Sequence, residues 1–172
     1  MNDNMKYVIE TRRNKDITPI KLNKIVSLKM QHWKYTRKEH INWIQKNISE
    51  NDYHLLLFNN SNNLIAYLNL IYVTVNFRSD SQEYLGIGNV CVDIELGSKG
   101  YGLFVMNLAT FYLKQLEQPG ILLCKNKLNP FYQKAGWNIY AGNSFISNKL
   151  NPNSVFTTNK VVASEIYVNK NF

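Results

Sequence analysis

The pattern of apolar and polar residues predicts a chain in which strands and helices are mixed along the sequence. Short apolar runs rich in Val, Ile, Leu and aromatic residues are typical of buried strands. Apolar residues spaced three and four positions apart are typical of helices with one buried face. The expected strands lie at residues 7–12, 53–58, 64–75, 85–94, 121–124 and 137–140, and the expected helices begin after Thr18, near Thr36, at Tyr101 and at residue 128.

Two helix starts are marked by capping residues. Thr18 precedes Pro19, which is the usual pairing of an N-cap with a first-turn proline. Thr36 is followed three positions later by Glu39, which is the sequence signature of a capping box. We expect each of these helices to bury one apolar stripe. The stripes comprise Leu22, Ile25, Val26, Met30 and Trp33 in the first helix and Ile41, Ile44 and Ile48 in the second.

Two hairpins are expected. The first joins the strands at 53–58 and 64–75 through the Asn-rich loop 59–63, because Asn tolerates positive φ. The second is formed by residues 155–158 and 161–168, which look extended. We expect this second hairpin to close the chain and to pair either with the last strands or with a second subunit, which leaves a homodimer open.

The strand at 85–94 leads through a glycine-bearing turn at 98–102 into a long apolar helix. A turn of this kind presents free backbone N–H groups and the positive end of the helix dipole at one place, which favours an anion such as phosphate. The Walker phosphate loop is excluded because two apolar residues follow Gly102. The dinucleotide-binding fingerprint is excluded because its third small position would be Cys91, inside the strand.

Two stretches resemble motifs of the Gcn5-related N-acetyltransferase (GNAT) superfamily. Residues 92–102, Val-Asp-Ile-Glu-Leu-Gly-Ser-Lys-Gly-Tyr-Gly, resemble the phosphate-binding motif A, with Gly97 where the family usually has Arg or Gln and Ser98 where it usually has Gly. Residues 129–137, Asn-Pro-Phe-Tyr-Gln-Lys-Ala-Gly-Trp, resemble the family's Phe-Tyr-x-Lys-x-Gly-Phe motif. The order and spacing of the two motifs extend the resemblance over residues 5–142.

The resemblance implies a single α/β domain of the acyltransferase type over residues 1–172. Its expected architecture is a mixed, mostly antiparallel sheet of six to seven strands with one splayed parallel pair, flanked by about four helices. The resemblance also implies acetyl-coenzyme A as the co-substrate. Gly86 and Gly88 would mark a bulge at which the splay begins.

In the resembled family, two main-chain segments hold the cofactor. The strand segment matched by Val90, Cys91 and Val92 would pair with the pantetheine arm, and one of its N–H groups would polarise the acyl carbonyl. Tyr132 matches the tyrosine that gives the leaving thiolate a proton or a hydrogen bond, and Asn126 lies one position from the family's usual Asn. The residues matched to diphosphate binding are Ser98, Lys99, Gly100, Tyr101, Gly102 and Leu103.

The residue that removes the proton from the attacking amine is not identified by the resemblance. The family often places a Glu near the start of the central strand, where this chain has glycine and asparagine. Three candidates remain: Glu83 just upstream, His54 on a neighbouring strand, and His32 in the loop between the first two helices, which lines the acceptor pocket in the resembled fold. Proton loss through water, or an amine that binds already neutral, also stays open.

The composition agrees with one globular domain. The chain has 172 residues, of which 45% are hydrophobic and 19% are charged. The first six residues contain no apolar signal region, and no apolar run approaches the about 18 residues of a membrane span, so a cytoplasmic protein without membrane contact is expected. Cys91 and Cys124 fit no metal-ligand spacing, so reduced core thiols and no metal are expected.

The net charge of +8 is unevenly distributed, with 11 basic against 5 acidic residues in 1–50 and 2 against 5 in 51–100. No Arg-rich cluster or RNA-binding signature accompanies it, which argues against nucleic acid. The expected function is transfer of an acetyl or short acyl group from acyl-coenzyme A to the amine of a small molecule, such as a neutral or anionic amino sugar or metabolite. Two alternatives stay open: a non-catalytic coenzyme A-binding module, and a basic protein that binds nucleic acid or an acidic partner.

Overall fold

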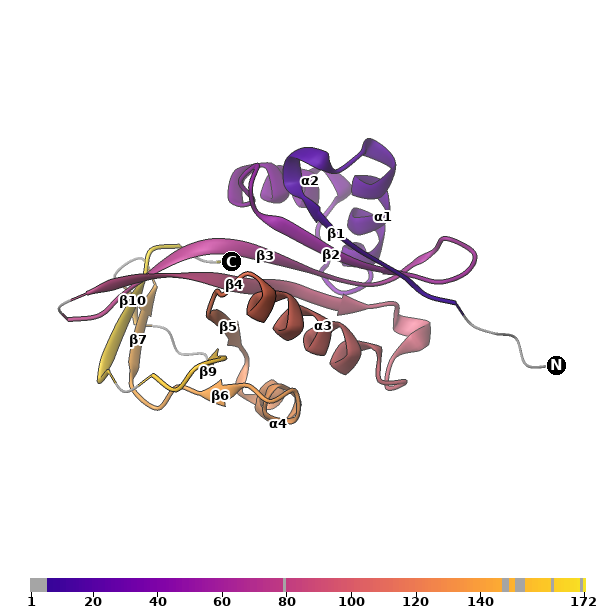
Figure 1. Cartoon of the computed structure of the whole chain (residues 1–172). Helices are drawn as coiled ribbons and strands as arrows, with labels where there is room; N and C mark the ends of the chain where they lie inside the picture. Colours follow the sequence, from indigo (N-terminus) through magenta and orange to yellow (C-terminus); the bar gives the residue numbers. More distant parts are fainter. Residues whose placement is uncertain (1–5, 79, 147–148, 151–153, 162, 171) are drawn as a thin grey trace. The chain divides into compact units, whose positions relative to one another are not determined.

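The structure is a computed structural model, shown in Figure 1, that describes residues 6–78, 80–146, 149, 150, 154–161, 163–170 and 172. The chain forms two compact units, each built from two segments. Unit 1 consists of Met1–Leu70 and Asn89–Val105, and unit 2 consists of Ile71–Gly88 and Met106–Phe172. Strands β3 (Leu64–Asn76) and β4 (Ser81–Val92) and helix α3 (Tyr101–Gln115) each contribute residues to both units. The expectation of one acyltransferase domain over the whole chain stays a prediction.

The strands of unit 1 form an antiparallel meander. β1 (Val8–Arg13) pairs with β2 (Tyr53–Phe58), and β2 pairs with the first half of β3. β2 is buried along its whole length, as its continuous apolar run predicts. The predicted hairpin loop between β2 and β3 is confirmed, and Asn62 adopts a φ of 58° within it.

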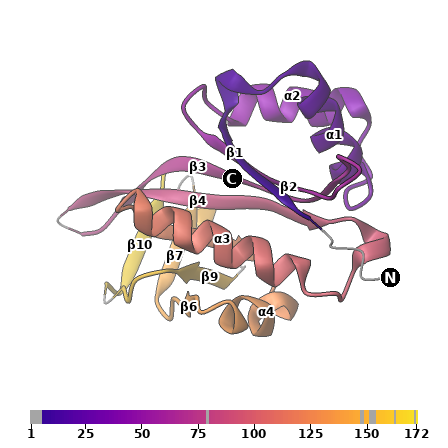
Figure 2. The same ribbon diagram turned by 45° about the vertical axis from the view of Figure 1, so that its right-hand side comes forward.

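The helices of unit 1 are α1 (Pro19–Met30) and α2 (Arg37–Asn47), and Figures 1 and 2 show both on the same side of β1 and β2. Both predicted caps are confirmed, since Thr18 accepts from the Lys21 N–H and the Thr36 capping box is complete in both directions. The second predicted stripe is confirmed at Ile44 and Ile48, which are buried.

The predicted stripe of α1 is only partly correct. Ile25 and Val26 are buried as expected, but Met30 is 43% exposed. Lys29 is buried in its place, at 2% exposure. Its ammonium lies over the ring of Trp43, at 4.3 Å from the centroid, so an aromatic contact allows a charged side chain to turn inward.

Unit 2 contains the predicted parallel pair of strands. β5 (Gly120–Cys124) follows α3 and pairs in parallel with β4, with Leu85 opposite Gly120. On its other edge, β5 pairs antiparallel with β9 (Ser154–Thr157), which in turn pairs with β6 (Asn138–Ile139). The short helix α4 (Asn129–Lys134) lies where the sequence predicts it.

The predicted closing hairpin is wrong. β9 pairs with β5 and β6, whereas β10 (Glu165–Val168) pairs antiparallel with β3 and parallel with β7 (Asn143–Ile146). The alternation of apolar residues identifies a strand but does not identify its partner. Short strands in this part of the chain, including β8 (Lys149–Leu150), raise the number of strands above the six to seven expected. The order across unit 2 is β6-β9-β5-β4-β3-β10-β7-β8.

In the described part of the chain, the sheet is therefore mixed and mostly antiparallel, with two parallel pairs, β4–β5 and β7–β10, and with four α-helices, which confirms the predicted fold class. None of the helices in the described part of the chain is both long and apolar enough to span a bilayer.

Candidate functional site

The end of β4 is fixed by hydrogen bonds within unit 1. The Asp93 N–H donates to the Ile65 carbonyl of β3 at 2.9 Å. The Asp93 carboxylate then accepts from the Glu95 N–H at 3.0 Å and so caps a short 3-10 helix, Ile94–Leu96. These contacts set the direction in which the chain leaves the sheet and enters the glycine-bearing turn.

The turn presents backbone N–H groups as the sequence predicts. Ser98 and Gly100 both have positive φ, at 61° and 90°. The hydrogen-bond ladder of α3 begins with the Phe104 N–H, which donates to the Gly100 carbonyl at 3.0 Å. The N–H groups of the first turn therefore have no acceptor within the helix. Residues 98–100 are exposed and residues 101–103 are half-buried, so an anion can reach them.

The start of α3 is anchored to the segment that precedes β1. The hydroxyl groups of Tyr7 and Tyr101 lie 2.7 Å apart, and the two rings meet edge to face with centroids 5.8 Å apart. Because Tyr101 is the first residue of α3, this contact limits the orientations that the N–H groups of the first turn can adopt.

His32 lies in the loop after α1, as predicted, and is exposed. Its Nε2 lies 2.6 Å from the Val92 carbonyl, and a carbonyl only accepts, so Nε2 carries the proton. The neutral ring then keeps an unprotonated Nδ1. The preceding residue, Gln31, accepts from the Ile94 N–H at 3.0 Å, so two consecutive side chains join the end of α1 to the end of β4.

His54 is fully buried, and both of its ring nitrogens are engaged. Nε2 donates to the Asn14 side chain at 3.0 Å, and Nδ1 accepts from the Tyr67 hydroxyl at 2.8 Å. Burial, with a smaller contribution from the Lys29 charge, lowers the pKa of His54 to about 4. The role as base that the sequence left open is untested for His54, but its contacts are those of a structural residue.

Tyr132 lies on α4 in unit 2 and is 7% exposed. Its ring contacts those of Phe131 and Phe156, with centroids 4.9 and 5.8 Å away. Burial, reinforced by the nearby Cys124, raises the pKa of Tyr132 to about 12. The phenol therefore keeps its proton at neutral pH and remains a hydrogen-bond donor.

Two further predicted residues of unit 2 are exposed. Asn126 lies two residues after the end of β5, and its side-chain oxygen accepts from the Ser154 hydroxyl at 2.8 Å. Glu83 lies in the first, exposed part of β4. Cys124 and Cys91 are buried and free, as predicted, and burial raises the pKa values of these thiols to about 11 and about 12.

β4 contains an irregular residue near the point where the parallel pair ends, and this residue is Asn89. The bulge expected at Gly86 and Gly88 stays a prediction. The parallel ladder joins Leu85–Ile87 to Gly120–Leu122 and ends there, although β5 continues to Cys124. The positive φ, 53°, belongs to Asn89 rather than to a glycine. The Asn89 side chain donates to Asn69 of β3 at 2.6 Å. Sequence reasoning missed this pair, for which the available signal was an Asn inside each of two apolar strands.

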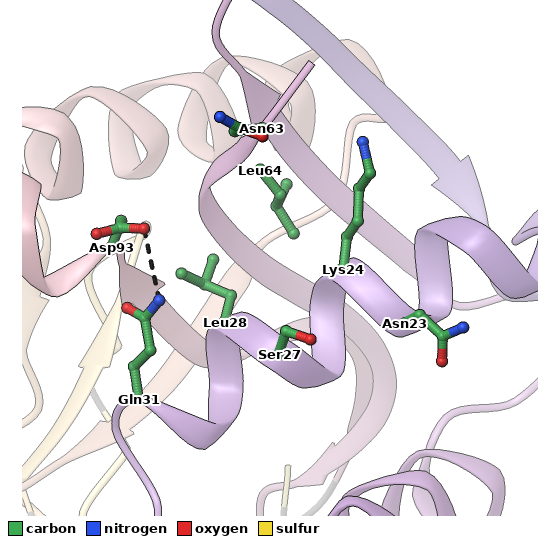
Figure 3. A pocket seen from close by; sticks show the side chains of 8 residues that line it. All are labelled: Asn23, Lys24, Ser27, Leu28, Gln31, Asn63, Leu64 and Asp93. Carbon is green, nitrogen blue, oxygen red and sulfur yellow. Dashed lines mark hydrogen bonds between the residues drawn. The ribbon is translucent and has the colours of Figure 1, made fainter. Parts of the chain in front are cut away.

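Unit 1 also contains a pocket of about 320 Å³ beside α1, shown in Figure 3. None of the residues predicted for the site lines it. Gln31 and Asp93 meet at its edge at 3.4 Å, too long for a strong hydrogen bond. The lining residues are Asn23, Lys24, Ser27, Leu28, Gln31, Asn63, Leu64 and Asp93. Within the described residues, no group of three or more His, Cys, Asp or Glu side chains is placed to hold a metal ion.

The fold is similar to that of solved N-acyltransferases of the GNAT type. An acyl-CoA N-acyltransferase from Pseudomonas aeruginosa superposes with a TM-score of 0.67 at 16% identity, over 90% of this chain and 100% of that one. A GNAT family N-acetyltransferase from Escherichia coli in complex with CoA superposes with a TM-score of 0.69 at 12% identity, over 98% and 93%.

Glucosamine-6-phosphate N-acetyltransferase from Arabidopsis thaliana shares the fold with a TM-score of 0.58 at 16% identity, over 78% of this chain and 94% of that one. No protein-family model matches the sequence, and no curated protein matches it either. At these identities the likeness concerns the fold, and it confirms the GNAT fold that the two sequence motifs predicted.

Proposed function

We propose that the protein transfers an acetyl or short acyl group from its coenzyme A thioester to the amine of a small molecule. The observation that carries the proposal is the exposed turn with free N–H groups between β4 and α3. It occurs in a fold shared with acyl-CoA N-acyltransferases, one of which was crystallised with CoA. Acetyl-coenzyme A is the proposed co-substrate.

The N–H groups of residues 98–103 would bind the diphosphate at the positive end of α3, and Lys99 adds a charge on the exposed turn. The Asp93 N–H points to β3, and the backbone groups of successive residues point alternately to the two edges of a strand. The N–H groups of Val92 and Val90 therefore point to the edge of β4 opposite β3. These two residues would pair with the pantetheine arm. Cys91 lies between them and turns its own main chain toward β3.

The reaction forms a C–N bond between the amine and the acyl carbon and breaks the C–S bond of the thioester. A strand N–H would stabilise the negative charge on the carbonyl oxygen. Among the three candidate bases we assign proton removal to His32, since its Nε2 is held on the Val92 carbonyl and the neutral ring then has Nδ1 as its proton acceptor. His54 and Glu83 are left out of the mechanism.

Tyr132 would interact with the leaving sulfur. A thiol with a pKa of about 8.5 is a stronger acid than a phenol with a pKa of about 12, so complete proton transfer from Tyr132 to the thiolate is uphill. We therefore propose that Tyr132 donates a hydrogen bond that stabilises the thiolate as it leaves. Asn126, two residues after the end of β5, is the proposed second cofactor contact in unit 2.

The test is titration with acetyl-coenzyme A by calorimetry, in the natural chain and in two glycine variants. Gly100→Ala places a side chain at a φ of 90° and distorts the turn, so we expect at least 10-fold weaker binding. Gly97→Ala is the matched control, because alanine also adopts the Gly97 φ of −53° and its Cβ would need only a small shift of the Ile94 carbonyl oxygen, 3.3 Å away. Absence of binding below millimolar concentration, or equal binding by both variants, would overturn the proposal.

A second measurement separates an enzyme from a non-catalytic binding module. Release of free coenzyme A thiol is followed with a panel of amino sugars and amino acids. Amine-dependent release is expected from an acyltransferase, whereas binding without any release with the whole panel would identify a binding module. Retention on heparin that falls steeply with salt would support the nucleic-acid alternative instead.

A further inference from the structure

A group of polar side chains lies between the helices and the sheet of unit 1. Tyr67 and Asn69 are two positions apart on β3 and share a face, and His54 of β2 is directly opposite Asn69. The Asn14 side chain joins His54 to the end of α2, since it accepts from His54 Nε2 and donates to the Ile48 carbonyl, both at 3.0 Å. His54 therefore faces the helices, and Lys29 of α1 packs against Trp43 of α2 on the same side of the sheet. The buried members of this group are Lys29, His54, Tyr67 and Asn69.

Lys29 is a buried cation without an anion. Its ammonium lies 4.3 Å from the ring centroid of Trp43 and 5.9 Å from that of Trp33. Among the described residues, no carboxylate forms an ion pair with it and no group forms a hydrogen bond with it. Burial lowers the pKa of Lys29 to about 8, so the side chain is still mostly charged at pH 7. Burying a charge without a partner costs stability.

Asn69 is a second buried donor without an acceptor. Its Oδ1 accepts from the Asn89 side chain at 2.6 Å, whereas its Nδ2 has no hydrogen-bond partner among the described residues. Asn89 adopts a positive φ, which is unfavourable for a residue other than glycine. The Asn69–Asn89 hydrogen bond is therefore kept at a conformational cost.

We infer that Lys29 and Asn69 form the oxyanion-binding part of the acceptor site, and that the acceptor amine carries a carboxylate or a phosphate group. The Lys29 ammonium and the Asn69 amide are both hydrogen-bond donors, and they lie on the same face within unit 1. An oxyanion would supply the acceptor atom that Asn69 lacks and the negative charge that Lys29 lacks. Trp33, Trp43 and Asn89 are half-buried and form the more accessible edge of the group. This inference rests on the proposed function, because it names the class of acceptor.

The test compares paired ligands by the fluorescence of the tryptophans, two of which flank Lys29. Glucosamine 6-phosphate is titrated against glucosamine, and β-alanine against its amide, so that the two pairs distinguish phosphate from carboxylate. We expect at least one member that carries the phosphate or carboxylate to bind at least 10-fold more tightly than its partner without that group. In Lys29→Met this preference should disappear, whereas in Lys46→Met, which removes an exposed lysine from α2, it should remain.

Stability is measured in the same variants. Because the buried charge of Lys29 is unpaired, Lys29→Met should unfold at the same or a higher temperature than the natural chain. Asn69→Leu removes the orphan amide and should weaken binding of the anion while the chain still folds. A preference for the anion that survives in Lys29→Met would overturn the inference, as would the absence of any preference in the natural chain.

The two proposals fail in different ways. Coenzyme A binding depends on the turn at residues 98–103, and its loss in Gly100→Ala tests the proposed function alone. A protein that binds and uses acetyl-coenzyme A but prefers the member of each pair without the phosphate or carboxylate would keep the proposed function and overturn the oxyanion site.

Discussion

The interiors of the two units differ in polarity. Among the described residues, most of the buried polar or charged side chains belong to unit 1, and so do all of the buried Lys, His and Asp side chains. Those in unit 2 are a serine and a threonine, which carry no charge. The described residues of this kind are Lys29, His40, Asp52, His54 and Asn69 in unit 1 and Ser144 and Thr157 in unit 2.

Unit 2 is instead marked by close contacts between glycine backbone and apolar side chains. A Cβ on Gly120 would lie 2.6 Å from both Leu113 and Trp137, and a Cβ on Gly86 would lie 2.8 Å from the ring of Phe172. The difference suggests a division of roles. Unit 2 is tightly packed and contains Tyr132, the residue proposed to interact with the leaving sulfur. Unit 1 keeps polar groups in its interior, which lowers its stability, and such a cost is expected where a ligand is bound.

The largest expected effect is on the pH dependence of stability, and it arises in unit 1. The pKa of His54 is about 4 in the folded chain against about 6.5 when unfolded, so the unfolded chain binds the proton more tightly. His54 therefore contributes stability above pH 6.5 that is lost as the pH falls toward 4, by about 3 kcal/mol in all. Urea unfolding at pH 4 to 7.5 measures this loss.

The control for this prediction is His54→Gln. Glutamine keeps a donor for Asn14 and an acceptor for Tyr67 but does not titrate. The pKa of His40 is also lowered by burial, so a residual slope from His40 is expected in the variant. Parallel profiles for the variant and the natural chain would show that His54 is not the group responsible.

The second prediction concerns packing in unit 2. Gly120→Ala forces a methyl group against Leu113 and Trp137, and we expect a loss of about 2–3 kcal/mol in the free energy of unfolding. If overpacking is the cause, combining Gly120→Ala with Leu113→Ala should cost less than the sum of the two single changes. Additive losses in urea unfolding would rule out this explanation.

These predictions also show what the sequence could and could not reveal. The caps at Thr18 and Thr36 and the turn before α3 depend on residues within a few positions of one another, so local rules predicted them. The inward position of Lys29 depends on Trp43 of another helix, and the Asn69–Asn89 contact joins residues 20 positions apart. Such contacts have no local signature.

The same reason explains the errors near the end of the chain. Apolar residues identified β9 and β10 as extended, but their partners, β5 and β3, precede them by at least 30 and 91 residues at the paired positions. A strand pattern alone carries no information on partners at that distance. The motif around Tyr132 correctly predicted the short helix α4, because its signal lies within a few consecutive residues, whereas the role of Tyr132 stays a prediction.

The third prediction tests the chemical role of unit 2. Tyr132→Phe removes the proposed hydrogen bond to the thiolate, and turnover should fall about 10- to 100-fold, or about 1.4–2.7 kcal/mol, with little change in affinity for acetyl-coenzyme A. Tyr140→Phe is the control, because the Tyr140 hydroxyl donates to the Ala163 carbonyl and serves the fold. If both variants lower turnover equally, the effect of Tyr132 is structural.

The smallest expected effect lies at Gly86. Its close contact is with the ring of Phe172, a half-buried side chain that can turn aside, whereas Gly120 is enclosed by two larger apolar residues. Gly86→Ala should therefore cost less than about 1 kcal/mol. In a Phe172→Ala background the added methyl group should cost nothing, and thermal unfolding of the four chains measures the coupling. Two results would contradict this explanation: a loss of stability as large as that of Gly120→Ala, or a loss that is unchanged when the Phe172 ring is removed. Either result would mean that the backbone of β4 restricts the position.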